Sequence, residues 1–226
     1  MCGRYTLFAN YEDIVDRFEI EAGIAEEEYE KSYNIAPSQQ VLTVINDGSV
    51  NRLGYLKWGL VPSWAKDAKI GYKLINARAE SLADKPSFRN AYRNRRCLIV
   101  ADSFYEWKRN GENKVPMRIK MKSNQLFAMA GLWEAWTTPE GRKLYTCSII
   151  TTEANELVSQ IHDRMPVILP REYEGKWLDP SVHDTNVLSR LLKPFDDELM
   201  EAYEVSAALN SPKNNNADFI KEKITE

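Results

Sequence analysis

Five short apolar segments follow one another between residues 97 and 151, and turn-forming residues separate them. Two of the separators are Asn110-Gly111 and Glu140-Gly141, dipeptides that favour tight turns. Strands joined by such turns pair with one another and run antiparallel. The series therefore predicts an antiparallel β-sheet at the centre of the fold. Its members are Cys97 to Ala101, Ser103 to Lys108, Val115 to Met121, Leu126 to Glu134 and Leu144 to Thr151.

Shorter elements surround this series. Residues 1–8 look extended, and two further strands are predicted on either side of the turn Asp47-Gly48, at Val41 to Ile45 and Tyr55 to Val61. Apolar residues at helical spacing predict helices at Tyr11 to Glu19, after Pro86, and at Glu153 to Ile161. Strands and helices do not alternate regularly. We therefore expect an α+β fold, a single domain with a curled antiparallel β-sheet or barrel-like core and flanking helices.

Length and composition are consistent with one globular domain. The chain has 226 residues, of which 43% are hydrophobic and 28% charged. No apolar run reaches the roughly 18 residues needed to cross a membrane, and the first residues do not resemble a signal peptide. We expect a cytoplasmic monomer without membrane association. Residues 211–216, with Pro212 and three asparagines, look like a mobile, linker-like segment.

The three cysteines lie at positions 2, 97 and 147, and this spacing forms neither a zinc motif nor a redox pair. Cys97 and Cys147 belong to apolar segments and are predicted to be buried in strands. Cys2 is the exception, because no strand or helix precedes it. With only two histidines in the chain, we expect no metal and no cofactor.

Charge is distributed unevenly along the chain. The stretch from Arg52 to Arg96 holds 11 Lys or Arg against 3 acidic residues, whereas Glu12 to Glu30 holds 9 acidic residues and one arginine. A basic stretch of this kind forms either a groove for an anionic ligand or a solvated helix face. Charge alone does not decide between these two interpretations.

Cys2 has a chemical property that an internal cysteine lacks. Removal of Met1 leaves an α-amine beside the thiol, and the two groups have ordinary pKa values near 8 and 8.5. The amine condenses with an aldehyde to an imine, and the thiol then closes a five-membered thiazolidine ring. The alternative to a reactive N-terminal cysteine is that Cys2 follows the start methionine by chance. Met-Cys-Gly also begins amidotransferases with an N-terminal nucleophile, but this likeness stops after three residues.

A set of downstream motifs resembles one family. In order, and together with Met1-Cys2-Gly3-Arg4-Tyr5, they look like the SRAP family (SOS-response-associated peptidases, the abasic-site shield proteins). The resemblance runs from Met1 to about Asp218, so we expect an SRAP-like domain at 1–218 and a C-terminal tail at 219–226. The motifs are Tyr33 to Pro37, Trp58 to Trp64, Ile75 to Glu80, Phe104 to Trp107, Ala130 to Glu134, Ile149 to Asn155 and Ile161 to Pro166.

The resemblance implies a function and a set of site residues. It implies binding to single-stranded DNA that contains abasic sites, and a covalent thiazolidine between Cys2 and the sugar aldehyde that shields the lesion during the DNA damage response. The implied catalytic residues are Cys2, Asn76, which orients the amine, Glu106, the acid–base carboxylate, and His162, which assists opening of the sugar ring. The implied DNA contacts are Arg4, Asn34, Pro37, Trp64, Arg78 and Trp107.

Residue chemistry supports two of these roles independently. Opening a cyclic hemiacetal requires proton transfers, and a carboxylate and an imidazole suit them near neutral pH. Glu106 stands in an apolar aromatic strand, where an uncompensated charge is unfavourable. The chain departs from the family where Pro and Gly are common, since it has Val100 and Ser103 there. Ser103 must then adopt a positive φ, at about 1 kcal/mol, or the turn must differ.

Three functions remain in competition. The first is a self-crosslinking protein with weak abasic-site lyase activity through the same imine. The second is a cysteine peptidase that acts on its own N-terminus, as the family name implies. The third is a non-covalent binder of single-stranded DNA. In each DNA-binding case we expect a cytoplasmic protein that associates with the nucleoid when bound to DNA.

Overall fold

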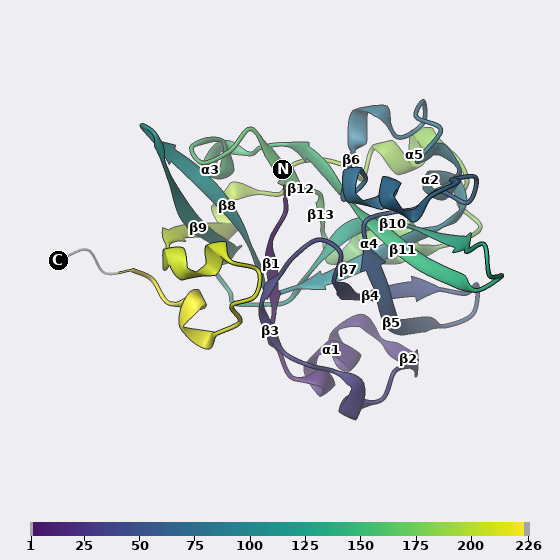
Figure 1. Cartoon of the computed structure of the whole chain (residues 1–226), viewed down its shortest axis with the longest axis horizontal. Helices are drawn as coiled ribbons and strands as arrows, with labels where there is room; N and C mark the ends of the chain where they lie inside the picture. Colours follow the sequence, from purple (N-terminus) through teal and green to yellow (C-terminus); the bar gives the residue numbers. More distant parts are fainter. Residues whose placement is uncertain (1, 224–226) are drawn as a thin grey trace.

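The computed structural model describes residues 2–223 (Figure 1). Within them the strands are β1 (Tyr5–Leu7), β2 (Ile20–Gly23), β3 (Ser32–Ile35), β4 (Gln40–Asn46), β5 (Asn51–Trp58), β6 (Asn76–Arg78), β7 (Arg96–Ala101), β8 (Ser103–Asn110), β9 (Asn113–Met121), β10 (Phe127–Thr137), β11 (Lys143–Glu153), β12 (Arg164–Pro166), β13 (Ile168–Leu169) and β14 (Met200–Glu204). The α-helices are α1 (Tyr11–Phe18), α2 (Arg89–Asn94), α3 (Glu156–Ser159), α4 (Arg171–Leu178) and α5 (Thr185–Ser189). Short 3₁₀ helices are η1 (Glu26–Glu28), η2 (Ala68–Lys73), η3 (Ala79–Ser81), η4 (Asp197–Leu199), η5 (Ala207–Asn210) and η6 (Ala217–Ile220).

Five strands of the larger sheet close on themselves into a barrel. The antiparallel order β11-β10-β7-β4-β5 is completed by a further pairing between β5 and β11. That closing pair is parallel, with Thr146 beside Lys57 and Cys147 beside Trp58. The predicted α+β single domain with a barrel-like core is confirmed. The sheet is mixed rather than purely antiparallel, because β2–β5 and β6–β11 also run parallel.

A second, five-stranded sheet carries the start of the chain. Its order is β14-β9-β8-β1-β3, which places β1 between β8 and β3. Tyr5 lies opposite Phe104 of β8 on one side and Ile35 of β3 on the other. In Figure 1 this sheet stands on one side of the molecule and the barrel on the other, with the N-terminus at the edge between them.

The predicted elements are found, with shifted ends. All five strands predicted between residues 97 and 151 are present as β7 to β11, and α1 buries Ile14 and Phe18 as its spacing indicates. The strand predicted at Tyr55 to Val61 begins earlier and ends at Trp58. The helix predicted at Glu153 to Ile161 shrinks to α3, because Glu153 pairs with Arg164 at the end of β11.

The loop between β5 and β6 folds back on itself through two glycines. Gly59 has a φ of +129°, and a Cβ placed on Gly71 would lie 2.6 Å from the Gly59 carbonyl oxygen. Only residues without a side chain permit this approach. The fold-back brings the Trp58 indole Nε1 to the Ile75 carbonyl, to which it donates at 2.8 Å, and so fixes the start of β6.

Residues 205–223 form a C-terminal strap over the second sheet. Asn34 Nδ2 donates to the carbonyls of Leu209, Ser211 and Asn214 at 3.1, 3.1 and 2.6 Å. Phe219 is buried against Tyr105 and Leu209. Residues 211–216 are therefore held in place, and the mobile segment predicted there was wrong. Residues 224–226, the end of the expected tail, lie outside the described residues.

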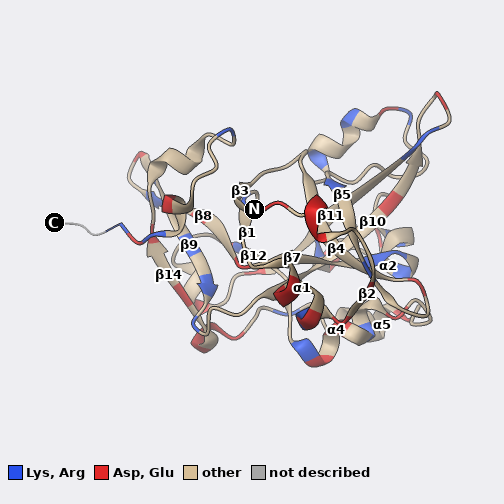
Figure 2. Ribbon diagram, turned by 90° about the horizontal axis from the view of Figure 1, so that it is seen from below, with Lys and Arg blue, Asp and Glu red and all other residues tan. Residues whose placement is uncertain are grey.

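Charge follows the division seen in the sequence (Figure 2). The acidic stretch falls on α1 and the segment after it, whereas α2 carries basic residues. Part of the basic stretch is structural: Arg96 is buried and donates to four backbone carbonyls, and Arg95 pairs with Glu134. Among residues 2–223, no helix is both long and apolar enough to span a bilayer.

Candidate functional site

Cys2 lies three residues before the start of β1 and is completely buried. Burial raises the pKa of its thiol well above the ordinary value, and the nearby Glu106 carboxylate raises it further. The Arg4 backbone N–H opposes this shift by donating to the sulfur. Cys97 and Cys147 are buried in strands as predicted. The expectation that Cys2 differs from them in burial was wrong.

Glu106 faces the start of the chain because of the β1–β8 register. Tyr105 N donates to the Arg4 carbonyl at 2.9 Å, which continues the pairing of Tyr5 with Phe104 toward Cys2. Glu106 is 3% exposed, and burial raises its pKa from 4.5 to about 7. A carboxyl with this pKa exists in both protonation states near neutral pH, which suits proton transfer in either direction.

The turn before Glu106 differs from the family pattern without strain. Ser103 begins β8 with ordinary strand backbone and has no positive φ. Its buried hydroxyl lies 2.5 Å from Thr6 Oγ1 and accepts from Arg118 Nε at 2.9 Å. The serine thus ties β8 to β1 and β9 by side-chain hydrogen bonds that a glycine cannot make.

Asn76 begins β6, beside Ile149 of β11. Its amide nitrogen and oxygen are both buried, and neither has a hydrogen-bond partner within residues 2–223. Buried amides are nearly always paired, so an amide with two unused polar atoms is uncommon. Asn76 therefore has donor and acceptor capacity available for a bound ligand.

His162 lies in the turn between α3 and β12. Its Nδ1 accepts from the Arg164 backbone N–H at 3.0 Å and lies 2.9 Å from Asp163 Oδ1. A backbone N–H is always a donor, so the neutral ring carries its proton on Nε2. Burial lowers the pKa of His162 and the Asp163 carboxylate opposes this shift. The Asp163 carboxylate also adds to the raised pKa of Glu106, which places the turn in electrostatic range of that carboxyl.

Asn76 and His162 lie on segments at opposite edges of β11. Thr151 of that strand pairs with Arg78 of β6 and with Pro166 of β12. One strand therefore positions both elements. Cys2 and Glu106 come from the second sheet, so the four predicted catalytic residues are supplied by both sheets.

Three of the predicted DNA contacts are held by the C-terminal strap. Arg4 Nη1 donates to Asn34 Oδ1 and to the Leu209 carbonyl, each at 2.7 Å, and its guanidinium lies 5.7 Å from the Trp107 ring centre. Trp107 Nε1 donates to Asn210 Oδ1 at 2.8 Å. Arg4, Asn34 and Trp107 thus form a connected structural cluster, whose part in DNA contact stays a prediction.

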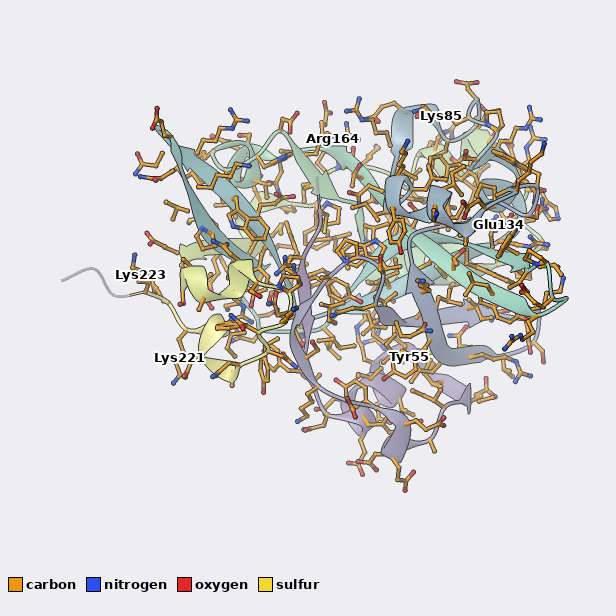
Figure 3. All side chains as sticks on the ribbon, in the orientation of Figure 1. Tyr55, Lys85, Glu134, Arg164, Lys221 and Lys223 are labelled. Carbon is orange, nitrogen blue, oxygen red and sulfur yellow. The ribbon has the colours of Figure 1, made fainter. Side chains whose placement is uncertain are left out.

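The other predicted contacts face solvent. Trp64 is 57% exposed, Arg78 is exposed and Pro37 is partly exposed. Exposed lysines at positions 66, 69, 73 and 85 lie on the same part of the chain, and Figure 3 labels Lys85 at the molecular edge that also carries Arg164. Exposed aromatic and basic side chains together suit stacked bases and phosphates.

Sequence reasoning missed two residues near these groups. The buried Tyr5 hydroxyl has no hydrogen-bond partner within residues 2–223 and is electrostatically coupled to Cys2 and Cys147. In the sequence, only the position of Tyr5 within the motif Met1 to Tyr5 could have marked it as a site residue. Tyr72, which is 65% exposed, had no motif to mark it. No cluster of three or more potential metal ligands occurs among residues 2–223.

Comparisons with known proteins agree on one family. The family model for SOS response associated peptidase (SRAP) matches residues 1–212. The chain is 60% identical to the abasic site processing protein YoqW of Bacillus subtilis, over 98% of this chain and 99% of that protein. It is 32% identical to the abasic site processing protein HMCES of Gallus gallus, over 93% of this chain and 71% of that protein.

A solved structure extends the agreement to the fold. A crystal structure of a protein from Bacteroides thetaiotaomicron superposes with a TM-score of 0.90 at 29% identity, covering 99% of this chain and all of that one. Sequence motifs and overall fold therefore point in the same direction. The chain belongs to the SOS response associated peptidase (SRAP) family.

Proposed function

We propose that this protein processes abasic sites in single-stranded DNA by forming a thiazolidine between Cys2 and the sugar aldehyde. The relatives named abasic site processing proteins support the substrate class. The observation that carries the proposal is the buried Glu106 carboxyl beside Cys2, with its pKa raised to about 7. Removal of Met1, which the reaction requires, concerns a residue outside those described.

The proposed reaction has two bond-forming stages. The Cys2 amine adds to the open-chain aldehyde, and loss of water from the resulting carbinolamine gives an imine. The Cys2 sulfur then adds to the imine carbon, and the thiol proton ends on the nitrogen of the thiazolidine. If the imine instead loses a proton from C2 of the sugar, elimination of the 3′ phosphate gives the weaker lyase reaction.

Glu106 is proposed to move protons in both stages. As a carboxylate it accepts a proton from the attacking amine, and as a carboxylic acid it protonates the departing hydroxyl. A pKa near 7 makes both forms available at neutral pH. Its place beside the Cys2 thiol also suits transfer of the thiol proton during ring closure.

His162 and Asn76 are proposed to act before and during amine attack. The neutral imidazole with its proton on Nε2 is suited to donate to the ring oxygen of the closed sugar as the ring opens. The two unused polar atoms of the Asn76 amide are suited to hold the amine of Cys2 in line with the aldehyde.

DNA binding is proposed to use the exposed aromatic and basic side chains. Arg78 contacts a phosphate and Trp64 stacks on a base, and both side chains are exposed. The Arg4, Asn34 and Trp107 cluster and the Pro37 loop line the DNA close to Cys2. Asn34 already bonds to Arg4 and to carbonyls of the strap. These hydrogen bonds favour a role for Asn34 in shaping the DNA-binding surface over direct contact with the DNA.

A peptidase acting through Cys2 is less well supported. A cysteine nucleophile needs a lowered pKa, whereas burial and Glu106 both raise that of Cys2. A purely non-covalent DNA binder does not account for a buried carboxyl placed beside the thiol. Denaturing electrophoresis distinguishes the three functions, because only a covalent protein–DNA crosslink survives denaturation.

The test uses oligonucleotides with and without one abasic site. Wild-type protein is expected to give a heat-stable shifted band with abasic DNA alone, and intact mass reports whether Met1 is absent. Cys2→Ala is expected to lose the band and to retain abasic-DNA binding in a filter assay. Cys97→Ala, another buried cysteine, is the matched control and keeps the band. A full-strength band from Cys2→Ala contradicts the proposal.

A further inference from the structure

Beyond Glu106 the strands β8 and β9 continue into solvent as a two-stranded hairpin. On one edge, pairing with the start of the chain ends where Tyr105 N donates to the Arg4 carbonyl at 2.9 Å. On the other edge, pairing with β14 ends at Met117. Among residues 2–223, the backbone of residues 107–115 pairs only within the hairpin itself. Figure 1 shows this hairpin extending away from the rest of the molecule on the side of α3.

The hairpin carries an excess of positive charge. Lys108, Arg109 and Lys114 are all exposed, against one acidic residue, Glu112, in the turn. Within residues 2–223, none of the three basic side chains has an ion-pair or hydrogen-bond partner. We call these three residues the basic arm. Their charges are therefore available to an anionic ligand.

Lysines on an exposed strand edge also have a simpler explanation. They prevent the edge from pairing with strands of other molecules. Strap lysines at a comparable distance from the core are paired instead, as Lys223 is with Glu204 at 2.6 Å. Edge protection accounts for charge on the hairpin, but it does not account for the position of the hairpin beside the candidate site.

That position follows from the strand that the arm shares with Glu106. Side chains alternate along a strand, so Lys108 lies on the same face as Glu106, about 7 Å further along. Burial lowers the pKa of His162, and the Arg109 cation adds to this lowering. The arm therefore lies within electrostatic range of the His162 turn as well.

The exposed residues proposed to contact DNA lie on the other side of the site. Arg78 ends β6 and Trp64 lies in the loop before that strand, whereas the His162 turn leads into β12 at the opposite edge of β11. In the view of Figure 1, the start of the chain lies between β6 and the hairpin. A DNA strand whose sugar reaches Cys2 thus has Arg78 on one flank and the basic arm on the other.

We infer that the basic arm binds phosphates of the DNA strand on the flank of the abasic nucleotide opposite to Arg78. This inference rests on the proposed function, because it assumes that the sugar is bound at Cys2. Phosphates recur at every nucleotide and attract lysine and arginine whatever the bases are. The arm therefore adds affinity that is independent of base sequence, and it touches no reacting atom.

The experiment replaces all three residues of the arm by glutamine in full-length Cys2→Ala protein, so that binding is measured without a crosslink. Three single-stranded oligonucleotides of equal length carry the abasic site at the centre, near the 5′ end or near the 3′ end. We expect the triple variant to bind the central site about tenfold more weakly at low salt. The dependence of log affinity on log salt is expected to flatten by about 2, because each phosphate contact on a single strand contributes about 0.7.

The two end-placed sites locate the contact. We expect the full loss of affinity on one of them and no loss on the other, because there the strand is too short to reach the arm. Equal loss on both end-placed sites is a general effect of charge and overturns the inference. Unchanged affinity for all three oligonucleotides also overturns it.

The matched control removes the same charge elsewhere. Lys176, Arg190 and Lys193 are exposed and lie on segments without a predicted site residue. Their triple replacement by glutamine is expected to leave affinity and salt dependence close to those of the parent protein. A loss as large as that of the arm variant overturns the inference, because net charge then explains both.

Crosslinking by the arm variant with Cys2 restored separates binding from chemistry. We expect slower crosslinking at low DNA concentration, in proportion to the lost affinity. Slowing that persists at saturating DNA, with affinity unchanged, overturns the inference in favour of an effect of Arg109 on His162. Flank-dependent binding by a wild type that forms no crosslink refutes the thiazolidine reaction alone. A wild type that crosslinks, with no flank-dependent loss in the variant, refutes the role of the arm alone.

Discussion

Replacing Glu106 by glutamine is expected to change how the stability of the protein depends on pH. Burial raises the pKa of Glu106 from 4.5 to about 7 in the folded state. Between these two values the unfolded chain has released the proton and the folded chain retains it. The free energy of unfolding therefore falls as pH rises through this window. The raised pKa corresponds to about 3 kcal/mol, because each pH unit is worth about 1.4 kcal/mol.

Glutamine keeps the shape of the side chain and never ionises. We expect Glu106→Gln to match wild type at pH 4 and to exceed its stability by about 3 kcal/mol at pH 8. Urea unfolding followed by tryptophan fluorescence at several pH values measures this difference. Asp102, whose pKa is raised by burial to about 6, titrates in both proteins and cancels.

Glu112→Gln is the control, since Glu112 is exposed in the turn after the same strand. Its effect is expected to stay within about 0.5 kcal/mol at every pH. A Glu106→Gln effect that is constant from pH 4 to pH 8 would falsify the assignment of a neutral Glu106 at low pH. The same variant is expected to slow crosslinking about a hundredfold or more.

Three further predictions address the sugar ring, the DNA backbone and the strap. His162→Ala is expected to slow crosslinking to a natural abasic site far more than to an open aldehyde; equal slowing in single-turnover assays removes the ring-opening role. Arg78→Ala is expected to weaken binding to all sequences alike and to flatten the dependence of log affinity on log salt by about one charge; a loss confined to one base sequence contradicts phosphate contact. Phe219→Ala is expected to lower the free energy of unfolding by about 3 kcal/mol, because the buried Phe219 side chain packs the strap against Tyr105 of the second sheet; an unchanged urea midpoint shows that the strap is dispensable.

Local sequence patterns were sufficient to predict most strands but not how the barrel closes. Among the segments from β7 to β11, the turns Asn110-Gly111 and Glu140-Gly141 correctly indicate the antiparallel pairs β8–β9 and β10–β11. The single predicted sheet was wrong, because β8 and β9 belong to the second sheet while β7, β10 and β11 belong to the barrel. The closing pair between β5 and β11 joins residues nearly ninety positions apart, as in Trp58 beside Cys147. Such pairing depends on the total shape of the sheet, and no local pattern encodes it.

The sequence motifs mark candidate site residues but do not predict the environment in which the structure places them. Motifs mark Cys2, Asn76, Glu106 and His162 as candidates, but the burial of Cys2 follows from the packing around the start of the chain, next to the β1–β8 pairing. The strap was missed because its anchors are backbone carbonyls that receive hydrogen bonds from Asn34 and Arg4. Carbonyls are present at every residue, so a polar segment such as 211–216 has no distinguishing mark in the sequence.

The environment of Cys2 also bears on the order of the two proposed stages. Burial and Glu106 raise the pKa of the thiol, so the sulfur is a neutral thiol at physiological pH and a weak nucleophile. Direct attack on the aldehyde by sulfur is therefore disfavoured, and the amine acts first. Imine formation places a positive charge beside Glu106, which favours its carboxylate form and lowers its pKa. That carboxylate is then the base beside the thiol when ring closure requires one, so the first stage prepares the group that the second stage uses.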